Sequence, residues 1–134
     1  MGLAERRATQ EFQNKVFPGL KSRILDAAGF EVPIDVDWDS IADPNEARIY
    51  EEYWTKIFFE PLIGAFKVIC VDDLGKQALQ ESLKKIEIVN TKSASNFRGF
   101  SFADGILKLD HKLVNADDIQ DRTEGIVKIL ESSL

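Results

Sequence analysis

The pair Asp104-Gly105 is the feature that most constrains how this chain can fold. Both central residues of a two-residue type I′ turn adopt a positive φ, which Gly and Asp tolerate better than most residues. The strand pairs would be Ala103 with Ile106, Phe102 with Leu107, Ser101 with Lys108, and Phe100 with Leu109. Because side chains alternate along a strand, the phenylalanines and leucines share one face. The sequence therefore predicts a hairpin within residues 97–111 that has one buried side.

Residues 31–39 alternate between apolar and polar side chains, which is typical of a half-buried strand. The apolar positions are Val32, Ile34, Val36 and Trp38, and the acidic positions are Glu31, Asp35, Asp37 and Asp39. Pro33 cannot donate a hydrogen bond to a neighbouring strand, so it favours a place at the edge of a sheet. Carboxylates on the polar side would discourage this edge from aggregating with another sheet.

Four-residue spacing of apolar side chains predicts a helix over residues 3–28, kinked or broken near Val16–Pro18 and ended by Gly29. Further helical segments are expected over about 43–69, 73–84 and 117–134, and a second strand over 86–89. The order of elements is then α-β-α-α-β-β-β-α. We expect one α+β domain over residues 1–134, with a four-stranded, mostly antiparallel sheet and helices packed on one face. In this arrangement the last three strands form a meander, and the first strand pairs along one of its edges.

The charge of the chain is unevenly distributed, and this excludes some classes of partner. The net charge is −6, but residues 26–60 hold ten acids and two bases, a local charge of −8. Such a segment would repel nucleic-acid phosphates and would suit a basic protein partner, so we expect a protein partner and no nucleic acid. No apolar run reaches membrane-spanning length, and no signal peptide is evident, so we expect no membrane partner and a cytoplasmic location.

Motifs for cofactor or metal chemistry are not found in the sequence. The glycines form no phosphate-binding loop, and no serine lies in a G-x-S-x-G elbow. A single cysteine and a single histidine cannot form a Cys/His zinc site. We therefore expect no cofactor and no metal, and the sequence favours a protein that is not an enzyme.

Asp35, Asp37 and Asp39 are the first candidate site residues, since a strand would project them on one side about 7 Å apart. Carboxylates spaced in this way could bind a cation or divide into an acid and a base, although a solvated strand face explains them more simply. His111 is the second candidate, on the same face as Leu107 and Leu109 and across from Arg98. As a general base it would need an aspartate from another strand; otherwise it is a histidine at the rim of the core.

Tyr53 and Phe59 lie at the edges of the apolar stripe of their helix, so they are candidates for exposed aromatic contact surface. Together with an open sheet edge they could support a homodimer.

Three hypotheses on function follow. The sequence favours a small acidic protein-binding module, with Asp35, Asp37, Asp39, Tyr53, Phe59 and Arg98 as candidate binding residues. In general character it is similar to small immunity proteins, chaperones or adaptors, although no motif carries that similarity. The alternative is a small-ligand binder or hydrolase with a site built from Asp35, Asp37, Arg98 and His111. The third hypothesis is self-association as a homodimer.

Overall fold

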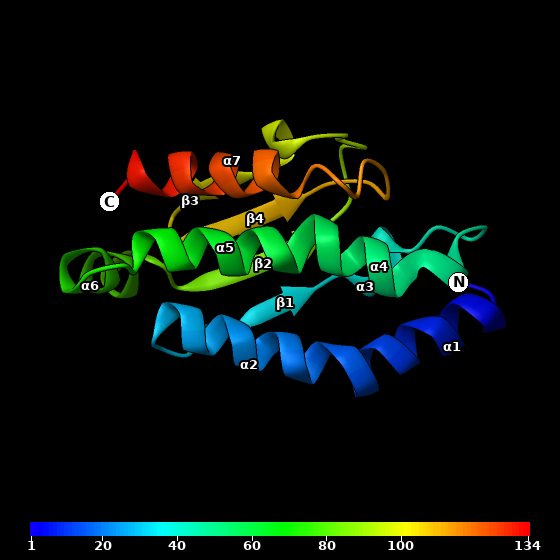
Figure 1. Ribbon diagram of the computed structural model, residues 1–134. Coiled ribbons are helices and arrows are strands. Elements are labelled where there is room, and N and C mark those ends of the chain that lie inside the picture. The colour runs from blue at the N-terminus through cyan, green and yellow to red at the C-terminus, as the bar shows by residue number, and fades with distance from the viewer.

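Four strands form one mixed sheet in the computed structural model, which describes residues 1–134 (Figure 1). The strands are β1 (Ile34–Val36), β2 (Lys85–Val89), β3 (Ser101–Ala103) and β4 (Ile106–Asp110). They lie in the order β1-β2-β4-β3; β1 and β4 run parallel to β2, and only β3 is antiparallel to its neighbour. The α+β class and the four strands are confirmed, whereas the expected mostly antiparallel sheet is wrong.

The route of the chain between β2 and β3 explains this difference. After β2, segment 90–100 does not turn back to pair with β2. It crosses to the far edge of the sheet, where β3 begins. The hairpin then brings β4 back between β2 and β3. There β4 runs antiparallel to β3 and parallel to β2. Leu107 and Leu109 of β4 are completely buried, whereas Ser101 and Ala103 of β3 are exposed. The central place therefore goes to the more apolar of the two hairpin strands.

The hairpin itself forms as the sequence predicts. Asp104 and Gly105 have φ values of 54° and 78°, as a type I′ turn requires. Ser101 pairs with Lys108, Phe102 with Leu107, and Ala103 with Ile106. Ladder pairing does not extend to Phe100 and Leu109, because residues 97–99 form a short 3₁₀ helix before the strand.

The long N-terminal helix is present and is bent before its proline. It consists of α1 (Leu3–Glu11), a π-helical turn (Phe12–Val16) and α2 (Phe17–Ala28). A proline ring clashes with the carbonyl four residues earlier, and the wider π turn removes the need for that hydrogen bond. Gly29 ends α2 with a left-handed φ of 80°.

The strand predicted over residues 31–39 is shorter than expected. The strand ends at Val36, because Asp37 accepts a hydrogen bond from the Ser40 backbone N–H and starts the short helix α3 (Trp38–Ile41). The alternation of buried and exposed side chains nevertheless continues from Val32 to Asp39. The edge position that Pro33 indicates is confirmed, since β1 is the first strand of the sheet.

The remaining helices follow the predicted segments with adjusted ends. They are a 3₁₀ turn (Ala47–Ile49), α4 (Tyr50–Trp54), a second π turn (Thr55–Phe59), α5 (Glu60–Ile69), α6 (Asp73–Ser82) and α7 (Ile119–Glu131). The helix expected at Asp43 begins later, because that side chain caps a local turn by accepting from the Asn45 N–H. No helix combines the length and the apolar character that crossing a lipid bilayer requires.

The helices cover one face of the sheet and enclose a single core. Figure 1 shows α2, α5 and α7 side by side in front of the strands. The covered face carries Ile34, Val36, Ile86, Ile88, Leu107 and Leu109, and the opposite face carries Asp35, Lys85, Glu87 and Lys108. An aromatic cluster fills the space between the two bent helices and α3; its members are Phe12, Phe17, Trp38, Trp54 and Phe59. The result is a single compact α+β domain with one open, polar sheet face.

Candidate functional site

The three aspartates of the sequence prediction lie at the β1 edge, and all three are exposed. Asp35 belongs to β1 and lies 3.4 Å from the Lys85 ammonium group, in an ion pair that is largely open to solvent. Asp37 caps α3, and Asp39 lies within that helix. The expectation that one strand projects all three on one side is wrong, because the strand ends at Val36. These three exposed carboxylates, which follow one another from β1 into α3, are called the acidic border below.

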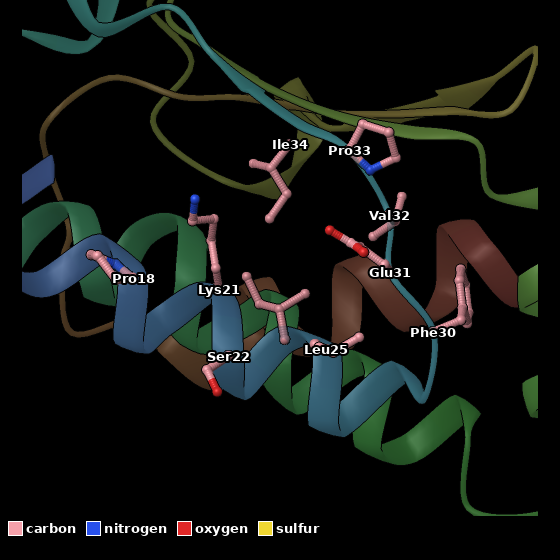
Figure 2. A pocket seen from close by; sticks show the side chains of 10 residues that line it. Pro18, Lys21, Ser22, Leu25, Phe30, Glu31, Val32, Pro33 and Ile34 are labelled. Carbon is pink, nitrogen blue, oxygen red and sulfur yellow. The ribbon is translucent and has the colours of Figure 1, made fainter.

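A groove runs beside this border, between α2 and the segment that leads into β1 (Figure 2). Its volume is about 440 Å³, and its walls include Ile24, Leu25, Phe30, Val32 and Ile34. Figure 2 shows the side chains of Lys21, Glu31 and Ile34 extending into the space between helix and strand. Apolar side chains therefore make up half of the groove's lining, which also includes one cation and one anion.

His111 is completely buried and does not face the acidic border. Its Nδ1 lies 2.6 Å from the carbonyl oxygen of Lys112, and its ring lies between those of Phe58 and Phe100. Burial lowers the pKa of His111, and the positive charge of Arg122 lowers it further. The ring is therefore a neutral core imidazole, and its Nε2 has no hydrogen-bond partner.

Arg122 of α7 is a buried charged residue that the sequence patterns did not single out. Its side chain is only 1% exposed, and its guanidinium donates to the carbonyl oxygens of Asn115, Ala116 and Lys56 at 2.8, 2.7 and 3.3 Å. Burial lowers the pKa of Arg122, against the opposing effect of Asp118 and Asp121. Its position three residues after Ile119 places it on the apolar stripe of the helix, which is the signal that could have identified it.

The residues of the expected ligand or hydrolase site are not brought together. Asp35 lies on the open face of the sheet, whereas His111 follows the parity of Leu107 and Leu109 on the face that the helices cover. The strands of the sheet therefore separate the carboxylate from the imidazole.

Arg98, another candidate residue of that site, also has no role in it. Arg98 is exposed in the 3₁₀ turn 97–99, where its backbone N–H donates to the Asn96 side chain. Asp110, the neighbour of His111, accepts hydrogen bonds from the backbone N–H groups of Thr91 and Lys92 and from the Thr91 hydroxyl. No three His, Cys, Asp or Glu side chains lie close enough together to hold a metal ion.

The aromatic contact surface expected on the helix is wrong for Phe59. That ring is completely buried, with its centroid 5.9 Å from the Phe12 ring and 5.5 Å from the Phe17 ring. The π turn before Pro61 rotates it inward, which a regular 3.6-residue period does not anticipate. Tyr53 is half-buried against the core, so the helix lacks the paired aromatic patch that the dimer hypothesis used.

Comparison of the chain with protein-family models, curated proteins and solved structures finds no match.

Proposed function

We propose that this chain is a protein-binding module whose contact surface is the acidic border at β1 and α3. The observation that carries this proposal is the placement of Asp35, Asp37 and Asp39, which are all exposed along one edge of the sheet. Charges on a surface steer oppositely charged partners and fix their orientation. The border therefore suits a basic protein surface.

The local ion pairs leave this border largely uncompensated. Of the ten acids in residues 26–60, Glu46, Glu52 and Glu60 pair with Arg48, Lys56 and Arg23. Those pairs lie on or near the helices, whereas the border itself has one basic contact, the exposed pair of Asp35 with Lys85. An exposed pair of this kind contributes little and yields readily to a better-placed cation.

Catalysis at the residues that the sequence singled out is not supported by their positions. The imidazole of His111 is buried and held by a backbone carbonyl, and Asp35 lies on the opposite face of the sheet. A general base needs access to substrate, and the completely buried ring of His111 lacks it.

A capture experiment tests the proposed function. The immobilised chain is incubated with an extract of the cells that produce it, and the retained proteins are compared with those kept by the Asp35→Asn/Asp37→Asn/Asp39→Asn variant. Asparagine preserves size and leaves Asp37's capping oxygen in place, so the variant changes charge alone. A matched control, Asp104→Asn/Glu124→Gln/Glu131→Gln, removes three exposed charges from the hairpin turn and α7.

The expected result is a basic protein that the native chain and the control retain and the border variant loses. Equal retention by both variants, or no specific retention by the native chain, would contradict the proposal.

A further inference from the structure

We propose that the free edge of β1 and the groove beside it bind an extended segment of the partner as a fifth strand, with basic and apolar residues alternating along that segment. This inference rests on the proposed protein-binding function and names the chemistry and geometry of its partner.

The backbone of β1 has hydrogen-bonding groups available on its outer side. The Pro33 carbonyl accepts from the Ile86 N–H at 2.9 Å, and the Asp37 N–H donates to the Ile88 carbonyl at 2.9 Å. The backbone N–H and C=O groups of odd-numbered residues therefore point toward β2. Because these groups alternate along a strand, those of Ile34 and Val36 point away from β2. These are the groups that an added strand would use.

Pro33 does not block this edge. Its carbonyl faces β2, so its missing N–H is lost from the side that is already paired. The outward donors of Ile34 and Val36 remain. Pro33 thus precedes an edge strand that keeps all of its outward-pointing N–H donors.

The rows of paired residues specify what an added strand should present to the helix side. Ile34 pairs with Ile86, Ile86 with Leu107, and Leu107 with Phe102, so this row is apolar through all four strands. The row ends at Ile34, which lines the groove together with Leu25 of α2. Leu25 is 43% exposed, so an apolar side chain from a fifth strand would cover it.

The next row specifies the opposite chemistry for the open face. It contains Asp35, Glu87, Lys108 and Ser101, so the two strands nearest the free edge both contribute a carboxylate. A lysine or arginine beside Asp35 would form a favourable cross-strand pair, and an acid there would be repelled. Apolar and basic residues must therefore alternate in the bound segment.

A second copy of this chain does not meet that requirement. Pairing two β1 edges would bring together Glu31, Asp35, Asp37 and Asp39 of both copies, and like charges across a strand pair are destabilising. The occupant is instead a basic segment of a different protein.

Binding of synthetic peptides to the full chain, followed by fluorescence anisotropy, tests the inference. The probe is a labelled nine-residue peptide of alternating valine and lysine, and its controls are alternating valine and glutamate, and the same valines and lysines in two blocks. We expect the alternating valine–lysine peptide to bind most tightly. The block peptide should bind at least about tenfold more weakly, and the glutamate peptide should show no binding.

Backbone methylation tests whether the peptide binds as a strand. In an antiparallel arrangement the valine amides would face β1, and in a parallel arrangement the lysine amides would do so. One of two peptides, N-methylated at alternate valines or at alternate lysines, should therefore lose at least about tenfold in affinity while the other keeps it. If both methylated peptides bind as well as the parent, no strand is added and the inference is wrong.

Two matched variants test the groove. Leu25→Lys places a cation in the wall that should receive apolar side chains, and we expect at least about tenfold weaker binding of the valine–lysine peptide. Val68→Lys changes a similarly exposed apolar residue on α5, away from the groove, and should leave binding unchanged. Equal binding by Leu25→Lys and the native chain would overturn the inference.

The peptide and capture experiments separate this inference from the proposed function. If the border captures a protein but no alternating peptide binds, the strand-addition inference is wrong and the protein-binding function stands. If neither the peptides nor any protein binds, the proposed function is wrong as well.

Discussion

Arg122 is a buried cation without a carboxylate partner. Three carbonyl oxygens accept its hydrogen bonds: those of Asn115 and Ala116 in the loop before α7, and that of Lys56 in the π turn Thr55–Phe59. A charged group in such surroundings is stabilised by oriented backbone dipoles, and removing it leaves those acceptors without donors. Arg122 therefore joins the loop 115–118 to the π turn between α4 and α5.

We expect Arg122→Met to lower the free energy of unfolding by about 3 kcal/mol, because it leaves several buried carbonyls unsatisfied. Arg98→Met, at an exposed arginine in the 3₁₀ turn 97–99, should change it by less than about 0.5 kcal/mol. Urea unfolding followed by tryptophan fluorescence measures both variants. Equal stability of the two variants would show that the buried hydrogen bonds of Arg122 contribute nothing.

His111 should make stability depend on pH in a predictable direction. Burial lowers its pKa in the folded chain below the value of about 6.5 that it has when unfolded. Between these two values the unfolded chain binds more protons, so the free energy of unfolding rises with pH there and falls as the solution becomes more acidic. The stabilising contribution is complete above about pH 6.5 and is lost on acidification towards the lower, folded pKa.

The matched variant is His111→Phe, which keeps an aromatic ring beside Phe58 and Phe100 but cannot bind a proton. Chemical unfolding at a series of pH values should show a shallower loss of stability below about pH 6.5 in the variant than in the native chain. Parallel pH profiles for the two proteins would refute a lowered pKa.

Among the helices, the glycines differ in what surrounds them. A Cβ at Gly125 of α7 would lie 2.6 Å from the Phe97 ring, whereas a Cβ at Gly19 of α2 would meet no atom within 4 Å. Gly125 is therefore a point of close packing between α7 and the 3₁₀ turn that precedes β3. Gly19 has no comparable reason to be glycine.

Replacing each of these glycines by alanine should have opposite effects. Gly19→Ala should stabilise the chain by about 0.5–1 kcal/mol through helix propensity, whereas Gly125→Ala should destabilise it despite the same propensity gain. Thermal unfolding of the two variants measures this contrast. Gly125→Ala should cost less stability when it is made in a Phe97→Ala background than in the native chain. A stabilising effect of Gly125→Ala in the native chain would contradict the close packing.

At the scale of the whole molecule, local signals in the sequence predicted local structure well. The hairpin follows from Asp104-Gly105, the bend before Pro18 from proline sterics, and the edge position of β1 from Pro33. The parallel pairing of β2 with β4 could not be predicted in this way. It depends on which strand of the hairpin lies beside β2, and the turn and strand patterns that predict the hairpin do not decide this.

In the candidate site, too, local features could be predicted from the sequence and the arrangement of distant segments could not. The exposure of Asp35, Asp37 and Asp39 and the inward position of His111 follow from alternation along the chain. The groove could not be predicted, because it depends on the separation between α2 and the segment before β1. Phe59 was misplaced because a π turn shifts the helical period by one residue.

The central claim is that the outer edge of β1 binds a partner segment, and amide hydrogen exchange measured by NMR tests it most directly. In the free chain the Ile34 and Val36 amides should exchange faster than that of Asp37, whose N–H donates to Ile88. With the valine–lysine peptide at saturation, we expect exchange at Ile34 and Val36 to slow at least about tenfold. Unchanged exchange at both amides while the peptide is bound would contradict the account.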